Sequence, residues 1–316
     1  MNDFSFLGYK FSPLELSDNQ RLSGFLSRYP QPLTGYTFAT LAAWQPFFRY
    51  GWTFAGPETL LISCYLGPDS HIHMLQPIGP LPHEIAQLLV NNAAALPYKL
   101  KIIGASDQFI KENAGFAKSF TVLEDRAVSN YVYGAEALAK LRGRKYAKKR
   151  NLIAQAGNLY NWSIHELTSG LTPSCFAVLD SILDEEYPKV EGMLKRELTA
   201  LECTLRHFDE FSQKGLLIAV DDRPVAFSIF EAISPTTVAI HFERALRSYK
   251  GLYQVINCET AKVIAAQGYK YINREEDLGD PGLRDAKMSY HPKEILPAYE
   301  LSLKKSGPEN GLNVDK

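Results

Sequence analysis

The stretch from Thr236 to Pro292 limits the fold of this chain most strongly, because strand and helix patterns alternate along it. Residues 237–242 have the composition of a β-strand, and a helix is predicted over residues 249–267. Ser248 is a suitable N-cap for this helix, and Gly268 is suited to end it. The stretch therefore begins as a strand that leads through a turn into a helix.

The second half of this stretch adds another strand and another helix. A strand is predicted over residues 270–274, and an acidic loop, Glu275–Asp277, follows it directly. Asp280 and Pro281 then predict a new helix, since an Asp cap with Pro at the first helical position is a favoured start. Polar groups gather where strands end and helices begin, which is how α/β proteins build ligand sites. A solvated loop in an ordinary domain is the alternative interpretation.

Length and composition limit the class of protein. A chain of 316 residues is long for one hydrophobic core, so two domains are expected. With 46% hydrophobic and 22% charged residues, the composition is that of a soluble globular protein. The formal net charge of −1 excludes a protein that coats nucleic acid through a generally basic surface. A local basic patch remains compatible with it.

The cysteines and histidines give no sign of disulfides or of a metal. The cysteines stand singly, without a CxxC pair, which predicts reduced thiols in a cytoplasmic protein. His71 and His73 share a strand face, but no carboxylate or cysteine lies near them, so no metal site is expected. No apolar run reaches the roughly 18 residues needed to span a bilayer, so no transmembrane segment is expected.

The strand and helix patterns divide into two similar halves. An N-terminal domain over residues 1–125 is predicted from strands at 60–65, 71–76, 99–104 and 120–124 and a helix at 83–95. A second domain is predicted over residues 126–304, and the polar residues 305–316 are expected to be a flexible tail. In the second domain the pattern predicts a strand, two helices and a hairpin before the stretch described first: 162–167, 173–187, 194–211, 215–220 and 224–231.

The segment Lys140–Arg150, called the basic segment below, carries an unusual local charge. Seven of its eleven residues are Lys or Arg, and none is acidic. Gly143 interrupts the predicted helix beside these charges, as a close backbone approach requires. Such a segment can bind nucleotide phosphates, an RNA backbone or a lipid headgroup. The alternative is a solvated helix face without a ligand.

The order of elements in the second half resembles the acyltransferase fold of the GNAT superfamily. In that fold a central strand diverges from its neighbour, and the pyrophosphate of the acyl donor lies on the N-terminus of the following helix. The resemblance implies donor binding at Arg247, Lys250 and Gly251, where N–H groups and the helix dipole attract anions. The chain departs from the superfamily's glycine loop, because Arg247 lies one residue farther from Gly251 and Tyr253 fills a normally small position.

A second resemblance covers nearly the whole chain. The segments YTFATLAAW, LQPIG, YVYGAEALAKLRGRKYAKKRN, HFERA, GLYQVIN and INREEDLGDPGLRDAKMSYHP are similar to a bacterial family of unknown function. That family is grouped with the C-terminal domain of phosphatidylglycerol lysyltransferases and, more distantly, with Fem-type aminoacyl transferases. The resemblance implies an α/β (α+β) fold of two tandem GNAT-like modules, with mixed sheets flanked by helices. It also implies transfer of an aminoacyl or acyl group from a carrier to an amine or hydroxyl.

Such a transfer needs a base for the acceptor, a positioned carbonyl and a donor or cation for the oxyanion. Strand alternation predicts that His241 and Glu243 share a face, with Glu231 on the neighbouring strand. The expected catalytic residues are Glu243, Glu275, Asp277 and Tyr290. The expected donor-binding residues are Arg247, Lys250, Gly251, Lys145, Lys148, Lys149 and Arg150, and the expected acceptor-binding residues are His241, Asn273 and Arg284. Structural ion pairs, for example of Glu276 or Asp277 with Arg284, are the alternative.

Two hypotheses of different classes follow. The first is an acyl or aminoacyl transferase without a tightly bound cofactor, whose donor is aminoacyl-tRNA or, second, acetyl-coenzyme A. The basic segment favours tRNA, since coenzyme A needs far less positive surface. Its acceptor would be a small molecule, a peptide or a lipid headgroup. The second is a non-catalytic binding protein for a nucleotide, a peptide or RNA, which the altered glycine loop favours.

Overall fold

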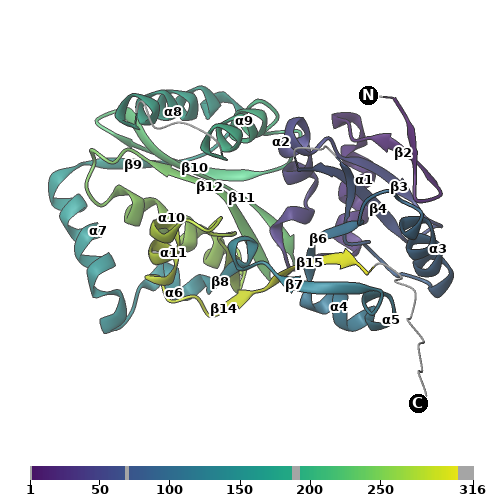
Figure 1. The fold of residues 1–316 in the computed structure, drawn as a ribbon. Coiled ribbons are helices and arrows are strands. Elements are labelled where there is room, and N and C mark those ends of the chain that lie inside the picture. The colour runs from purple at the N-terminus through teal and green to yellow at the C-terminus, as the bar shows by residue number, and fades with distance from the viewer. Residues whose placement is uncertain (1, 68–70, 187–192, 305–316) are drawn as a thin grey trace, which may run out of the picture. The chain divides into compact units, whose positions relative to one another are not determined.

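The computed structural model describes residues 2–67, 71–186 and 193–304. The chain forms two compact units (Figure 1). Of the described residues, the first contains 2–14, 48–67, 71–125 and 298–304, and the second contains 15–47, 126–186 and 193–297. The sequence-based division had placed residues 15–47 in the N-terminal domain and residues 298–304 in the C-terminal one. The predicted flexible tail, 305–316, lies outside the described residues.

The first unit is built on a mixed sheet with the strand order β1-β2-β3-β4-β5-β6-β15-β7. Strands β5 and β6 pair in parallel, and the other neighbours pair antiparallel. Leu89 of α3 and Phe116 of α5 pack against Leu61 and Ile102 of the sheet in its apolar core. The elements are β1 (Phe4–Phe6), β2 (Tyr9–Pro13), β3 (Gly51–Phe54), β4 (Leu60–Leu66), β5 (His71–Leu75), α3 (His83–Ala94), β6 (Lys101–Ser106), α4 (Asp107–Glu112), α5 (Ala114–Ala117), β7 (Phe120–Glu124) and β15 (Ala298–Leu303).

The second unit is built on a sheet with the strand order β14-β8-β13-β12-β11-β10-β9. Here β12 and β13 form the parallel pair. Its strands are β8 (Asn130–Gly134), β9 (Trp162–Glu166), β10 (Lys214–Val220), β11 (Arg223–Ser234), β12 (Thr237–Ala245), β13 (Tyr271–Asn273) and β14 (Glu294–Leu296). Its helices are α1 (Asn19–Arg28), α2 (Phe38–Phe48), α6 (Ala135–Lys140), α7 (Ala147–Leu159), α8 (Thr172–Glu186), α9 (Met193–Arg206), α10 (Leu252–Ala266) and α11 (Pro281–Met288).

Helices cover both faces of this second sheet. Figure 1 shows α8 and α9 on one face and α10 and α6 on the other. Val178 of α8 and Val255 of α10 both lie in the apolar core around Phe227 of β11. The predicted hairpin is confirmed, since β10 and β11 join at Asp221 and Asp222, which adopt positive φ angles of 48° and 64°. The predicted end of the first helix of the pair, at residues 187–188, lies outside the described ranges.

The two predicted helix starts in the Thr236–Pro292 stretch have different outcomes. The start of α11 is confirmed, because Asp280 is the N-cap, its side chain accepts from Leu283 N, and Pro281 follows it. Ser248 is not the N-cap of α10, which begins at Leu252 with Gly251 as its N-cap. The backbone first makes a tight turn, in which Tyr249 N donates to the Leu246 carbonyl and Leu252 N to the Tyr249 carbonyl. That turn delays the helix by three residues.

Gly251 is required by two independent features. Its φ of +90° is a left-handed conformation that side chains disfavour. A Cβ added there would lie 2.4 Å from the carbonyl oxygen of Leu152 in α7. The basic segment runs into α7, so this glycine lets that helix pack closely against the beginning of α10.

We expect Gly251→Ala to destabilise the protein more than Gly268→Ala does. Gly268 has nearly the same φ, +88°, but an added Cβ would meet nothing within 4 Å. The control should therefore report only the conformational cost, about 1–2 kcal/mol, and Gly251→Ala should add about 1–3 kcal/mol from the clash. Urea unfolding of both variants measures the difference. Equal losses would show that α7 does not press on Gly251.

Candidate functional site

The candidate site lies where β12 and β13 separate. The two strands pair only from Thr237 to Ala239 on β12 and from Tyr271 to Asn273 on β13. Beyond this point β12 stays with β11, whereas Arg274 and Glu275 exchange backbone hydrogen bonds with Tyr131 of β8. The strands therefore diverge, and charged side chains of β12 and of the residues that follow β13 pair with each other at this point.

A β-bulge at His241 divides these side chains between the two faces of the sheet. Phe230 pairs with Ile240 and Ile229 with Phe242, so His241 has no partner on β11. The prediction that His241 and Glu243 share a face is wrong for this reason, because the extra residue reverses the alternation. Glu243 lies opposite Ser228 and contacts Asn257 of α10, whereas His241 contacts Glu231 on the other face.

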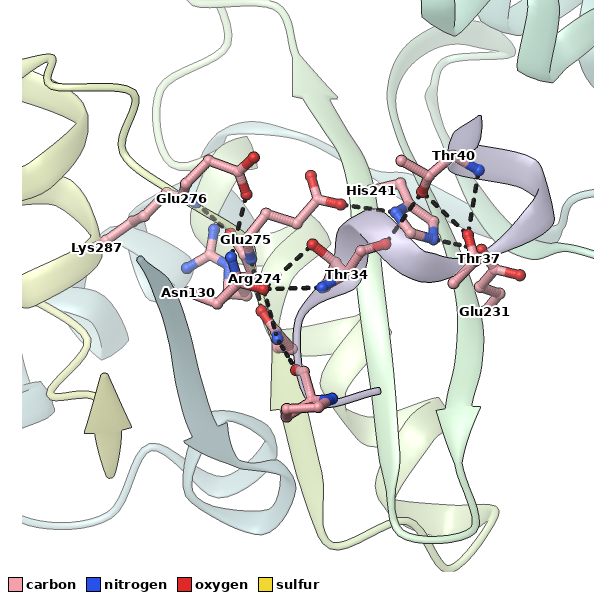
Figure 2. Close-up of polar contacts among 12 residues, drawn as sticks. Thr34, Thr37, Thr40, Asn130, Glu231, His241, Arg274, Glu275, Glu276 and Lys287 are labelled. Carbon is pink, nitrogen blue, oxygen red and sulfur yellow. Dashed lines mark hydrogen bonds and ion pairs between the residues drawn. The ribbon is translucent and has the colours of Figure 1, made fainter. Parts of the chain in front are cut away.

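On that other face His241 links two carboxylates. Its Nε2 lies 2.7 Å from Glu231 Oε1, and its Nδ1 lies 2.7 Å from Glu275 Oε1 (Figure 2). Burial disfavours the charged ring, but the two carboxylates outweigh this effect and raise the pKa of His241 to about 10. Both ring nitrogens then carry protons at neutral pH and donate. The position of Glu231 on the strand next to His241 is confirmed.

On the α10 face Glu243 forms a second group of contacts. Its Oε1 lies 2.8 Å from Arg274 Nη2, and its Oε2 accepts from Asn257 Nδ2 at 3.2 Å. The Arg274 guanidinium also lies 5.0 Å from the centroid of the buried Tyr290 ring. The Oδ1 of Asn257 is buried without a hydrogen-bond partner in the described part of the chain. The Glu243 carboxylate fixes the amide orientation, since only the NH₂ group can face it.

Asp277 anchors the acidic loop. Its fully buried carboxylate accepts from Arg284 Nε at 2.7 Å and Nη2 at 3.0 Å, and from the hydroxyl of Tyr131 at 2.5 Å. The backbone N–H of Gly279 adds a further hydrogen bond. Hydrogen bonds from Arg284 hold the pKa of Asp277 well below its usual range. These contacts match the structural ion pair that was the alternative interpretation of Asp277 and Arg284.

Asn273 fixes the end of β13. Its Nδ2 donates to Asn130 Oδ1 at 3.0 Å and to the Pro32 carbonyl at 3.3 Å, and its Oδ1 accepts from Glu275 N. Asn130 Oδ1 also accepts from the backbone N–H of Thr34 at 3.0 Å (Figure 2). Asn273 is fully buried and committed to these contacts. They attach residues 32–34 to the end of the strand.

Two further charged residues lie beside the acidic loop. The buried ammonium of Lys287 donates to the carbonyl of Arg274, and burial followed by the Arg274 charge lowers the pKa of Lys287. Glu276 is half-buried, and its Oε2 accepts from Asn130 Nδ2 at 3.3 Å. Burial, and then the neighbouring Glu275, raise the pKa of Glu276. Figure 2 shows Glu276 and Lys287 close together at the edge of the group.

The basic segment adjoins the Glu243 group through Lys149. Its Nζ lies 4.0 Å from the centroid of the Tyr290 ring and donates to Ser289 Oγ at 2.7 Å. Burial and the nearby Arg274 charge lower the pKa of Lys149. Arg150 instead donates to the carbonyls of Leu141 and Gly143, which stabilises the break between α6 and α7.

The remaining predicted donor-binding residues lie around this region. Lys145 and Lys148 are exposed, and Lys145 Nζ lies 5.1 Å from the Tyr146 ring centroid. Lys250 and Arg247 are exposed in the turn before α10, where the N–H of Lys250 donates to the Tyr160 hydroxyl. Gly251 is closed in by α7, as described above.

The sequence-based site did not include Arg274, Glu276 and Asn257. Arg274 lies at the end of a predicted strand, and its pairing with Glu243 across the divergence depends on the bulge. Asn257 lies within a helix of ordinary sequence, and nothing around it indicates a functional residue. Glu276 lies between Glu275 and Asp277, which were selected from the sequence. Nothing in the sequence distinguishes Glu276 from these two, and only its contacts in the structure do. Among the described residues, no group of three or more His, Cys, Asp or Glu side chains is arranged to hold a metal ion.

Comparisons with solved structures agree with the tandem fold. A conserved protein of unknown function from Bacteroides thetaiotaomicron is 27% identical, with a TM-score of 0.85, over 93% of this chain and 99% of that one. L-PGS from Bacillus licheniformis is 14% identical, with a TM-score of 0.62, over 92% and 93%. A tandem GNAT protein from the clavulanic acid biosynthesis pathway is 11% identical, with a TM-score of 0.52, over 95% and 99%. The second and third likenesses concern the fold alone.

The chain thus has a tandem GNAT-like fold, as predicted. More narrowly, the chain belongs to the family described as phosphatidylglycerol lysyltransferase, C-terminal, whose sequence model matches residues 27–301. This confirms the resemblance drawn from the sequence segments. A search among curated proteins finds no match. In the ranges that the structure describes, no helix has both the length and the apolar character to cross a membrane.

We expect Asp277→Asn to lower the free energy of unfolding by about 2 kcal/mol or more, since a buried charge-assisted pair is lost. Asp285→Asn, at an exposed position of α11, is the matched control and should be neutral. The lowered pKa of Asp277 means that its contribution is present above the ordinary Asp pKa and is lost as pH falls toward the folded value. Unfolding from pH 7 to about pH 2 should therefore show a constant difference between wild type and Asp277→Asn above about pH 4, and a smaller difference below it. A difference that stays constant down to the lowest pH would contradict the ion pair.

His241→Gln should show the opposite pH dependence. The folded pKa of His241, about 10, lies above the ordinary value, so its contribution is complete below about pH 6.5 and is lost as pH rises through 10. We expect the variant to be less stable than wild type by about 2 kcal/mol at pH 6, with the difference shrinking toward pH 10. Denaturant unfolding across this range measures it. A difference that grows with pH would exclude a charged ring.

Proposed function

We propose that this protein transfers an aminoacyl or acyl group from an anionic carrier to an amine or hydroxyl acceptor. Aminoacyl-tRNA is the favoured carrier, and a small molecule, a peptide or a lipid headgroup is the acceptor. The family, whose description names a lysyltransferase, and the tandem GNAT-like fold support the reaction class. The chemistry asks for a positioned ester, a proton acceptor and positive charge near the carrier.

One observation carries the proposal most directly. Lys149 of the basic segment lies on the Tyr290 ring, and the same ring lies beside Arg274, which pairs with Glu243. A carrier bound along the basic segment would therefore have its reactive end near the charged groups at the divergence of β12 and β13. A solvated basic helix without a ligand, which is the alternative interpretation, would not need the contact between Lys149 and Tyr290.

The packing at Gly251 favours tRNA over coenzyme A as carrier. A pyrophosphate on the N-terminus of α10 would need the space beside this glycine, where the Leu152 carbonyl oxygen already lies. A carbonyl oxygen has the wrong partial charge for an anion. The Lys250 N–H is also already bonded to Tyr160. The exposed Lys145 and Lys148 offer positive charge along α7 and just before it instead.

We expect Lys145→Glu with Lys148→Glu to weaken binding of fluorescently labelled aminoacyl-tRNA at least about tenfold. The slope of log affinity against log salt should fall by about two, because two phosphate contacts are lost. These residues are better targets than Lys149, which is half-buried on Tyr290. Fluorescence anisotropy at several salt concentrations measures both quantities.

The matched control is Lys214→Glu with Arg223→Glu, which reverses two exposed charges of the β10–β11 hairpin. It should leave affinity and slope nearly unchanged. Equal effects of the two double variants would refute a specific role for the basic segment. Thermal stabilisation by acetyl-coenzyme A, with none by charged tRNA, would overturn tRNA as the carrier.

A further inference from the structure

Three consecutive carboxylates follow β13, and two of them are committed to structural contacts. Glu275 Oε1 lies 2.7 Å from the charged ring of His241. Asp277 is fully buried under the two-point contact from Arg284 and the hydroxyl of Tyr131. A carboxylate held in this way cannot take up a proton without breaking its ion pair. Neither residue suits a base that must gain and lose a proton in each cycle.

Glu276, between them, is part of no ion pair among the described residues. Within these ranges its carboxylate accepts one hydrogen bond from another residue, the 3.3 Å bond from Asn130 Nδ2 to Oε2, and its own backbone N–H also stabilises the charge. Among these same residues, Oε1 is not one of the buried polar atoms that lack a partner. Glu276 as a residue is half-buried, so part of its side chain is exposed. No other described residue donates to its second carboxylate oxygen, which leaves this oxygen as an acceptor for a substrate.

The backbone holds Glu276 in place. Glu275 adopts the left-handed conformation with φ 58°, which is unfavourable for a residue with a side chain. Three contacts keep it there: its N–H donates to Asn273 Oδ1, its carbonyl accepts from Tyr131 N, and its side chain pairs with His241. Strained residues that several contacts determine in this way gather at functional sites. Here the strained residue Glu275 on one side and the anchored Asp277 on the other fix the backbone position of Glu276.

Charged groups from three elements influence the pKa of Glu276 through their electrostatic fields. They are Glu275 on the same loop, Lys287 on α11 and His241 on β12. Lys287 is itself influenced by Arg274 and Glu243. The nearby carboxylate and burial make a proton on Glu276 more favourable, while the cations keep the ionised form accessible. A group in this balance can accept and release a proton near neutral pH.

We infer that Glu276 is the catalytic base of the transfer, a role that rests on the proposed function. The acceptor nitrogen or oxygen attacks the ester carbonyl carbon of the carrier, and the new C–N or C–O bond forms. The carboxylate of Glu276 takes the proton that the nucleophile loses. The ester C–O bond then breaks, and Glu276 returns this proton to the oxygen of the departing carrier. Glu275 and Asp277 are positioning residues on either side.

The test compares Glu276→Gln, Glu276→Asp and the control Glu166→Gln, an exposed carboxylate of β9. The probes are tRNAs charged with radiolabelled amino acids, with phosphatidylglycerol vesicles or glycinamide as acceptors. We expect Glu276→Gln to lower kcat at least about 100-fold, with the KM for charged tRNA and the Tm unchanged. In wild type the transfer rate should rise with pH as the base loses its proton, and in Glu276→Gln this rise should be absent. Glu276→Asp should restore part of the rate, and the control should match wild type.

The outcomes separate the two proposals. Transfer by wild type, together with Glu276→Gln within threefold of its kcat and with the same pH profile, would overturn the role of Glu276 and leave the proposed function standing. If Glu276→Gln raised KM and left kcat unchanged, the residue would bind the acceptor and would not be the base. No transfer by wild type from any charged tRNA to either acceptor would refute the proposed function, and the role of Glu276 with it.

Discussion

The divergence of β12 and β13 is the constraint on which the rest of the candidate site depends. After Ala239 and Asn273 the two strands no longer share hydrogen bonds, so their backbone groups need other partners. Strand β12 keeps β11, and the chain after β13 turns to β8 through Tyr131. Side chains of β12 and of the residues that follow β13 pair at this point, His241 with Glu275 on one face of the sheet and Glu243 with Arg274 on the other. Most of those at this point are charged, and their pairing determines where each one can lie.

The buried charges here contribute more to geometry than to stability. Glu231, His241 and Glu275 carry a net charge of about −1, and Glu243 with Arg274 carries none. The desolvation of such pairs offsets much of their attraction, so an apolar replacement of similar shape would be about as stable. What an apolar replacement cannot do is hold a left-handed residue by its side chain, as His241 holds Glu275. These ion pairs therefore fix the conformation of the acidic loop Glu275–Asp277, and this conformation determines the position of Glu276.

Local signals in the sequence were sufficient for several elements and insufficient for the site. The Asp280–Pro281 helix start and the Asp221–Asp222 turn each depend on residues close in sequence, and both were predicted. The bulge at His241 depends on how β11 and β12 align over many residues, and no single residue type signals it. The insertion of β15 between β6 and β7 joins residues that are 175 to 201 positions apart, such as Tyr299 with Glu124 and Ser302 with Lys101, which no periodicity reveals. The residue types at the divergence of β12 and β13 identified candidate site residues in the sequence. The sequence did not predict which face of the sheet each side chain lies on or which residue it contacts.

The packing of α7 on α10 is the reason for proposing a carrier other than coenzyme A. A helix N-terminus attracts a phosphate only while its N–H groups and the space before them are open. In this chain Gly251 lets the Leu152 carbonyl approach that space, and Tyr160 bonds the N–H of Lys250. Positive charge is supplied instead by side chains of the basic segment, spread along a helix and not concentrated at one point. A single pyrophosphate gains little from such an array, whereas an extended polyanion can contact several of its charges at once, which is the physical basis for proposing tRNA as the carrier.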